Sequence, residues 1–182
     1  MPERGRGGLS RATIVEALTA LGRELSSRGV RAQVFVVGGA AIALAYSTRR
    51  VTKDVDAAFE PKAIVYEAAA KVADELGLPA DWLNDGAKAF MPGVDADAQP
   101  LPEVEGIEVS TASPRYLLAM KLMATRFGED DEDIEMLLRM LDVHSPDEAL
   151  AILESLYPRL DPPPKTRFFL EELLGGSDRP SG

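Results

Sequence analysis

Hydrophobic and polar positions in the first third of the chain predict two helices and two strands. Apolar residues recur at helical spacings between Ser10, a suitable N-cap, and Gly29, which predicts an amphipathic helix. Residues 34–37 are continuously apolar, as in a strand that is buried on both faces. An alanine-rich helix is expected from Ala40 to about Arg49. Residues 53–59 then alternate between polar and apolar, as in a half-buried strand.

Proline and glycine divide the remainder of the chain into further elements. A helix is expected from Pro61 to about Leu76, because proline suits the first helical turn and Gly77 follows the last one. Prolines interrupt residues 79–103, which predicts a loop without long elements. A final strand is expected at residues 106–111. Beyond it only helical patterns follow, with helices expected at 114–127, 132–141, 146–157 and 165–174.

The order of these elements predicts the fold class. Strands fall early and helices late, which indicates an α+β fold: a small mixed β-sheet with flanking helices, followed by a helical C-terminal subdomain. We expect the sheet domain at residues 10–112 and the helical subdomain at residues 113–174. A disordered leader at residues 1–9 and a flexible tail at residues 175–182 complete this division. A chain of 182 residues can bury a sufficient core without a metal ion or disulfide.

Composition excludes several kinds of site. The chain has no cysteine, which excludes disulfides and thiolate chemistry, and its single histidine, His144, excludes histidine-rich zinc sites. A formal net charge of −10 argues against coating nucleic acid through bulk electrostatics, although it leaves room for a local basic groove. The longest run free of charge and strong polarity is Val34–Tyr46, too short for the ~20 residues of a membrane-spanning helix. We therefore expect a cytoplasmic protein without a membrane partner.

A glycine pair and an aspartate pair carry the candidate chemistry. Gly38-Gly39 separates a predicted strand from a predicted helix, where backbone amides without a nearby Cβ suit an anion such as phosphate. Asp54 and Asp56 lie two residues apart on a predicted strand, so both carboxylates project from one face. They repel each other unless a divalent cation lies between them. Separately, each pattern has a plainer explanation: a tight turn, and a solvated strand edge.

Together, these features resemble the signature of the polymerase-β-like nucleotidyltransferases. That signature is a hydrophobic strand, a glycine pair, a helix and then Asp-hydrophobic-Asp, here Asp54-Val55-Asp56. Arg50 and Thr52 extend the similarity to the AbiEii/MenT-like toxin branch, which reads Arg-x-Thr/Ser-x-Asp-hydrophobic-Asp. The resemblance covers about residues 10–142 and includes small stand-alone members of that branch. It implies a polymerase-β-type nucleotidyltransferase core.

The resemblance also implies roles for these residues. Asp54 and Asp56 are expected to be catalytic and to hold Mg²⁺ or Mn²⁺ beside the NTP substrate. The residues expected to bind the nucleotide are Gly38, Gly39, Arg50, Thr52 and, from a later motif, Lys121.

Three further residues are candidates to complete the site. Glu108 alternates with apolar neighbours on its predicted strand and therefore faces away from the core. It is either a third catalytic carboxylate, which helps to deprotonate the attacking hydroxyl, or an ordinary surface glutamate. Lys121 is followed by Arg126, Asp130 and Asp133 in the order of the toxin branch, which implies that Lys121 contacts phosphates. Asp133 is the preferred catalytic aspartate over Asp130, because it lies inside the predicted helix. Without such a role, a lysine at this position extends to solvent.

The implied reaction is attack of a hydroxyl group on the α-phosphate of an NTP, with release of pyrophosphate. By resemblance, the acceptor is the 3′ hydroxyl of an RNA, foremost tRNA, and the protein is the toxin of a toxin–antitoxin pair with a cognate antitoxin as partner. An alternative is nucleotidylation of a protein or of a small molecule such as an aminoglycoside, which the negative charge favours. A second alternative is a non-catalytic antitoxin or binding module, against which the retained aspartate pair argues.

Overall fold

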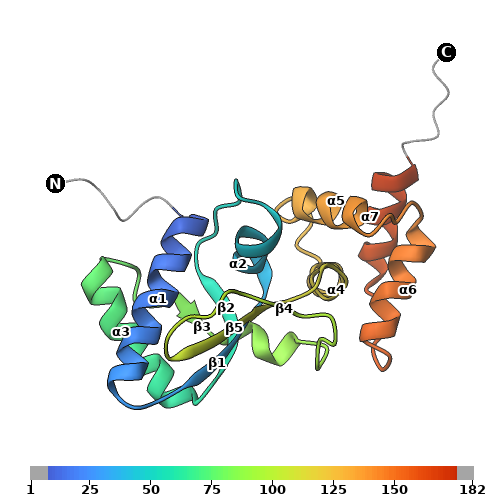
Figure 1. Ribbon diagram of the computed structural model, residues 1–182. Coiled ribbons are helices and arrows are strands. Elements are labelled where there is room, and N and C mark those ends of the chain that lie inside the picture. The colour runs from blue at the N-terminus through green and yellow to red at the C-terminus, as the bar shows by residue number, and fades with distance from the viewer. Residues whose placement is uncertain (1–7, 176–182) are drawn as a thin grey trace. The chain divides into compact units, whose positions relative to one another are not determined.

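A computed structural model describes residues 8–175 and contains a five-stranded mixed sheet (Figure 1). The strand order is β3-β2-β1-β5-β4. The central strand β1 runs antiparallel to β2 and parallel to β5, while β3 is parallel to β2 and β4 antiparallel to β5. The strands are β1 (Ala32–Val36), β2 (Val55–Glu60), β3 (Leu83–Asn84), β4 (Gln99–Pro100) and β5 (Ile107–Thr111). The predicted α+β class with a mixed sheet is therefore confirmed.

The described residues form two compact units. The sheet unit contains the described residues up to Ala89 together with Ala96–Ala112, and the helical unit contains Phe90–Asp95 and the described residues from Ser113 onward. The segment Phe90–Asp95 thus belongs to the helical unit, although it precedes β4 and β5 in the sequence. Two tyrosines hold it there: Tyr116 Oη donates to the Gly93 carbonyl at 2.7 Å and Tyr157 Oη to the Phe90 carbonyl at 2.6 Å.

Two long helices cover one face of the sheet (Figure 1). Helix α1 (Arg11–Ser27) begins where predicted, because Ser10 Oγ accepts a hydrogen bond from the Thr13 amide. Helix α3 (Lys62–Leu76) ends at Gly77, which adopts the left-handed conformation typical of a helix C-terminus. Between β1 and β2, α2 (Gly38–Ala41) continues into a π-helical turn, η1 (Ile42–Tyr46).

The strands of the sheet bury one face and leave the other more exposed. Residues 34–37 were expected to be buried on both faces, and this expectation is wrong for one face: Phe35 is only half-buried, between the buried Val34 and Val36. The physical reason is that α1 and α3 pack against a single face. In β2 the predicted alternation is present, but the strand begins at Val55, so that Asp54 lies in the bend just before it.

The proline-rich stretch between residues 79 and 103 supplies both edges of the sheet. It contains β3, the 3₁₀ helix η2 (Gly86–Phe90) and β4, none longer than five residues. Trp82 anchors it, because the indole is fully buried and its Nε1–H donates to the Ala69 carbonyl at 3.0 Å. The expected loop is therefore part of the sheet, with β3 held in a defined register.

The helical unit contains four helices, in which α4 packs against α5 and α6, and α6 against α7. Their bounds are α4 (Pro114–Ala124), α5 (Asp131–Met140), α6 (Pro146–Leu156) and α7 (Pro164–Gly175). Thr166 Oγ1 ties α7 to α4 by donating to the Leu122 carbonyl at 2.8 Å. The rings of Phe127 and Phe169 stack at 4.1 Å. These helices lie close to the predicted ranges.

The expected leader and tail lie largely outside the described residues, at 1–7 and 176–182. Leu9, assigned to the leader, is buried and forms a backbone bridge with Thr52, whose amide donates to the Leu9 carbonyl at 3.0 Å. Within residues 8–175, none of the helices has the length and apolar character needed to cross a membrane.

Candidate active site

Gly38 lies at the C-terminal end of β1, directly beside Asp56 of β2. The Val37 amide donates to the Asp56 carbonyl at 2.9 Å, which extends the β1–β2 pairing to this point. Gly38 has a φ of +63°, a left-handed conformation that suits glycine. A Cβ on Gly38 would lie 3.4 Å from Asp56 Oδ2. The backbone therefore turns beside the carboxylate at a position where no side chain stands.

Gly39 permits a second close approach, that of the segment before β2. A Cβ on Gly39 would lie 2.8 Å from Thr52 Oγ1, 3.2 Å from Thr52 Cβ and 3.5 Å from Arg50 Nη2. The bridge between Leu9 and Thr52 holds this segment from its other side. Two of the three predicted nucleotide-binding residues outside the glycine pair, Arg50 and Thr52, thus lie against the start of α2, so the glycines are more than a tight turn.

Asp54 and Asp56 lie next to the edge strand β3. Asp56 is paired in register with Asn84, and Asn84 Nδ2 donates to Asp54 Oδ2 at 3.1 Å. Both aspartates are half-buried. The structure therefore brings the predicted glycines, Arg50, Thr52 and both aspartates together at one end of β1 and β2.

The donor set at this end of the strands fits Mg²⁺ bound jointly with a nucleotide. Asp54 and Asp56 supply carboxylate oxygens, the ligands that Mg²⁺ prefers, and the vacant Cβ position at Gly38 leaves space beside Asp56. No group of three or more His, Asp or Glu side chains placed to hold a metal ion occurs within residues 8–175. Two carboxylates completed by substrate phosphates and water are the usual arrangement for Mg²⁺ at phosphate-transfer sites.

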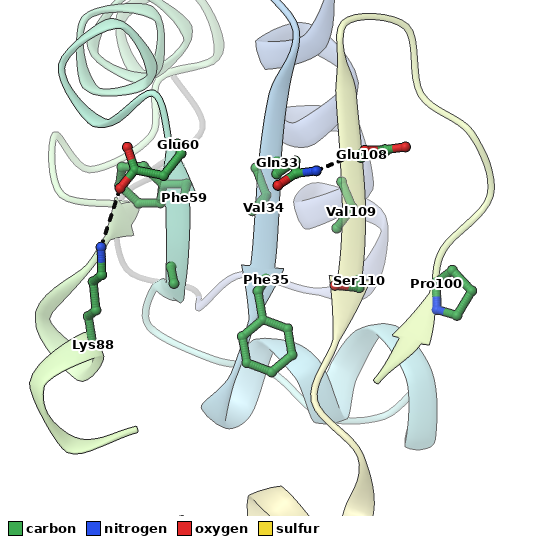
Figure 2. Close-up of a pocket in the computed structure, with 11 residues that line it drawn as sticks. Gln33, Val34, Phe35, Phe59, Glu60, Lys88, Pro100, Glu108, Val109 and Ser110 are labelled. Atoms are coloured by element: carbon green, nitrogen blue, oxygen red, sulfur yellow. Dashed lines mark hydrogen bonds and ion pairs between the residues drawn. The ribbon is translucent and has the colours of Figure 1, made fainter. Parts of the chain in front are cut away.

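A groove of about 500 Å³ lies on the more exposed face of the sheet (Figure 2). Figure 2 shows Phe35 extending from β1 into this groove, flanked by strands β2 and β5. Ala58, which lines the groove, is two residues from Asp56 on the same face of β2. The groove therefore extends along the strands from the level of Ala58 toward Glu60 and Glu108, and neither Asp54 nor Asp56 is among its described lining residues.

The charges along this groove are mostly negative. Glu60 and Glu108 line it, and of its described lining residues Lys88 alone is basic. Lys88 Nζ lies 3.4 Å from Glu60 Oε1, while Arg31 lies 3.5 Å from Glu108. All four side chains are at least half exposed, so these ion pairs are weak and easily exchanged.

Glu108 is not brought together with the aspartates. It projects from the same face of the sheet, as its alternation predicts, but it is paired in register with Gln33, whereas Asp56 pairs with the backbone of Val37. Four residues along a strand correspond to roughly 13 Å. Its partners are Gln33 Nε2 at 3.3 Å and Arg31. The geometry therefore favours the surface-glutamate explanation over a third catalytic carboxylate.

Lys121 and the two aspartates predicted with it form a buried cluster within the helical unit. Lys121 Nζ lies 2.7 Å from Asp130 Oδ1 and 3.0 Å from Asp133 Oδ2, and Arg126 Nε lies 3.3 Å from Asp130 Oδ2. The side chains of Lys121 and both aspartates are at most 9% exposed. The lysine thus does not extend to solvent, and both candidate aspartates contact it, so the cluster does not favour Asp133 over Asp130.

Asn84, which contacts Asp54, was not among the predicted site residues. The two residues contact each other in the folded structure, although they are thirty positions apart in the sequence. The pairing of β2 with β3 brings them together, and β3 is only two residues long. The one usable signal was a short tryptophan-containing segment between prolines, which predicts a buried anchor but not its register.

Comparison with known protein families identifies the family of the chain. The sequence matches a family described as a nucleotidyltransferase of unknown function (DUF6036) over residues 14–151. Neither the curated proteins nor the solved structures gave a significant match. The matched range contains the sheet, the glycine pair, both aspartates and the Lys121 cluster, and it spans well over half of the chain. The chain therefore belongs to the DUF6036 family of nucleotidyltransferases.

Proposed function

We propose that the protein transfers a nucleoside monophosphate from an NTP to a hydroxyl group in a Mg²⁺-dependent reaction. One observation carries this proposal: Gly38 turns directly beside Asp56, and Asn84 holds Asp54 next to it. An anion-accepting turn and two cation-binding carboxylates in one place are the parts that transfer of a phosphate-linked group requires. Membership of a nucleotidyltransferase family supports the same conclusion.

Each part of the site has a distinct role in this proposal. Gly38 and Gly39 admit the triphosphate close to the backbone, while Arg50 and Thr52 border it. Asp54 and Asp56 hold Mg²⁺, which when bound neutralises charge on the phosphates and orients them. The acceptor hydroxyl passes its proton to water as its oxygen bonds to the α-phosphorus, the bond between the α-phosphorus and the oxygen that bridges to the β-phosphate breaks, and pyrophosphate leaves. Catalysis then arises mainly from positioning and charge stabilisation.

The resemblance to the toxin branch implies that the acceptor is the 3′ hydroxyl of tRNA. It also implies that the protein is a toxin with a cognate antitoxin. These assignments rest on the sequence resemblance alone. Lys121 would contact phosphates in this branch, which would require its ammonium to serve two buried aspartates and the nucleotide together.

The groove favours a second candidate acceptor, a small molecule or a protein side chain. Its volume of about 500 Å³ lies in the usual range for small-molecule sites. A polynucleotide is held by a positively charged track, whereas this groove is lined by Glu60 and Glu108 and by Lys88. The lining therefore suits a neutral or cationic acceptor better than a polyanion.

Binding and transfer can be tested separately. Mg²⁺ with an NTP should raise the melting temperature of the parent protein by mass action, and Asp54→Asn/Asp56→Asn should abolish the rise. Asp74→Asn, an exposed aspartate on α3, is the matched control and should leave it unchanged. A double variant that still responds to Mg²⁺ and NTP would place the metal site elsewhere.

The acceptor is identified by following labelled NTPs in the presence of total RNA, a protein extract or an aminoglycoside. Label on tRNA-sized RNA, lost in Asp56→Asn, supports the RNA acceptor. Label only on protein or on the small molecule removes the RNA acceptor and supports the second candidate. Absence of Asp56-dependent label on every acceptor, with NTP binding intact, supports the non-catalytic alternative.

A further inference from the structure

Asn84 is anchored to the core through the residue that precedes its strand. Trp82 is fully buried, and its carbonyl accepts a hydrogen bond from the Val55 amide at 2.6 Å. This bond and the parallel pairing of Val55 with Leu83 fix the register of β3 against β2. As a result Asn84 lies directly beside Asp56, and a shift by one residue would require the indole to leave the core.

Both ends of the Asn84 side-chain amide are used. Its Nδ2 donates to Asp54 Oδ2 at 3.1 Å, and its Oδ1 accepts a hydrogen bond from the Gly86 amide at 3.1 Å. The Gly86 N–H can only donate, so it orients Oδ1 toward itself and Nδ2 toward the carboxylate. An aspartate at position 84 would present a second negative oxygen to Asp54, and an alanine would present nothing.

The turn formed by Asn84, Asp85 and Gly86 is also held by helix α3. Asp85 Oδ1 accepts a hydrogen bond from Tyr66 Oη at 2.6 Å, and Asp85 Oδ2 lies 2.5 Å from Lys62 Nζ. The Asp85 amide donates to Tyr66 Oη at 3.2 Å. The Lys62 ammonium, with the tyrosine hydroxyl, holds the pKa of the Asp85 carboxyl below its usual value. Asn84 thus sits on a turn that is tied down at both neighbouring residues.

Asp54 depends on such a partner because its own backbone does not lie in a strand. It occupies the bend before β2, where alternation no longer determines the side-chain direction. We propose that Asn84 is a positioning residue for the Mg²⁺ site: it fixes one carboxylate oxygen of Asp54 and leaves the other for the cation shared with Asp56. This inference rests on the proposed function, because it concerns the metal site described there.

The experiment measures binding of Mn²⁺ alone, as a paramagnetic substitute for Mg²⁺, to the full chain. Asn84 is the chain's single asparagine, so labelling with ¹⁵N-asparagine gives one side-chain amide signal that reports on this site. Mn²⁺ should broaden this signal in the parent protein but not in Asp56→Ala, a variant that adds no second asparagine. Mn²⁺ affinity, measured by water-proton relaxation, should fall by about 10-fold or more in Asn84→Ala, as for other residues that orient a metal ligand.

Gln33→Ala is the matched control, since Gln33 also donates an amide hydrogen bond to a carboxylate, Glu108, on the same face of the sheet. It should bind Mn²⁺ like the parent. Asn84→Ser, whose hydroxyl can still accept from the Gly86 amide but is too short to reach Asp54, should lose affinity like Asn84→Ala and serves if the alanine variant does not fold.

Each outcome separates the inference from the proposed function. If Asp56→Ala abolishes Mn²⁺ binding while Asn84→Ala and Asn84→Ser bind like the parent, the positioning role is refuted and the metal site stands. If Mn²⁺ neither broadens the Asn84 signal nor binds in an Asp56-dependent manner, the proposed metal site itself is refuted. A loss of melting temperature in Asn84→Ala with unchanged Mn²⁺ affinity would show a purely structural role and overturn the inference.

Discussion

The ammonium group of Lys121 lies 2.7 Å from the carboxylate of Asp130, and both side chains are at most 7% exposed. Asp133 lies 3.0 Å from the same ammonium, so that one lysine serves two buried carboxylates. Buried charges are tolerated only when they are paired and hydrogen-bonded. Lys121 therefore holds α4 and α5 together in addition to any contact with a nucleotide.

Replacement of Lys121 by Met should consequently destabilise the protein. The variant removes the ammonium that two buried carboxylates share and leaves Asp130 with its contact to the exposed Arg126. Breaking a buried ion pair by removing one partner typically costs about 3–5 kcal/mol of unfolding free energy. Chemical denaturation measures this loss. Arg139→Met is the control, because Arg139 is 71% exposed and its ion pair with Glu135 lies on the helix surface, where a loss below ~1 kcal/mol is expected. A Lys121→Met protein as stable as the parent would show that the cluster does not stabilise the fold.

Gly38→Ala should impair nucleotide binding beyond its effect on stability. The left-handed backbone makes any Cβ unfavourable by about 1–2 kcal/mol, and here the Cβ would also lie beside Asp56. Gly77→Ala is a close control, because Gly77 has a φ of +66° and open space around it. Both variants should lose similar stability in denaturation, but only Gly38→Ala should weaken the Mg²⁺ and NTP response. Equal responses would exclude a role for Gly38 in binding.

Gly39→Ala should displace Thr52 and destabilise the protein by about 1–3 kcal/mol through overpacking. Thr52→Gly removes the two atoms that would lie closest to a Cβ on Gly39, Thr52 Oγ1 and Cβ. In a double-mutant cycle, Gly39→Ala should therefore cost less in the Thr52→Gly background than in the parent. Additive effects in the cycle would mean that the two residues do not exclude each other.

Glu108→Gln should leave Mg²⁺ and NTP binding unchanged. Glu108 pairs with Arg31 and lies at the level of Gln33, roughly 13 Å along the strand direction from the level of Asp56. The melting-temperature rise with Mg²⁺ and NTP should therefore equal that of the parent, while Asp56→Asn should lose it. A loss in Glu108→Gln as large as in Asp56→Asn would restore the third-carboxylate role.

Stability of the helical unit should fall at alkaline pH through Tyr157. Burial raises the pKa of Tyr157 to about 12, from an ordinary value of about 10. The folded state therefore keeps a proton that the unfolded state releases, so its contribution to stability is present below pH ~10 and declines as pH rises toward 12. Urea unfolding between pH 8 and 11 should show this decline, and Tyr157→Phe should reduce its slope. An unchanged slope in Tyr157→Phe would assign the decline to other groups.

Local sequence patterns were sufficient to locate the long helices and to single out the glycine and aspartate pairs, but not for the predicted helix from Ala40 to about Arg49, which is a short α-helix followed by a π-helical turn that ends at Tyr46. Ser10 caps α1 and Gly77 ends α3, because capping depends on residues within one turn of each other. The glycine pair and the aspartate pair were identifiable because the two members of each pair lie close together in the sequence. Their capacity to bind phosphate or a cation can be recognised without knowledge of the fold. Their proximity to Arg50 and Thr52 followed from a resemblance rather than from periodicity.

Contacts between segments far apart in the sequence decided where Glu108 and Lys121 lie. The position of Glu108 follows from the register of β5 on β1, which alternation along one strand cannot reveal. The burial of Lys121 follows from the packing of α5 on α4, since a lone lysine in an apolar helix is equally compatible with a solvated tip.

The chain by itself thus determined the long helices, the strands β1, β2 and β5, the fold class and the two carboxylates, all of which depend on neighbouring residues. Tertiary structure alone decided the partner of Asp54, because Asn84 is thirty positions away and reaches it only through the pairing of β3 with β2. That pairing depends on Trp82 entering the core, a packing event for which no local pattern specifies the register.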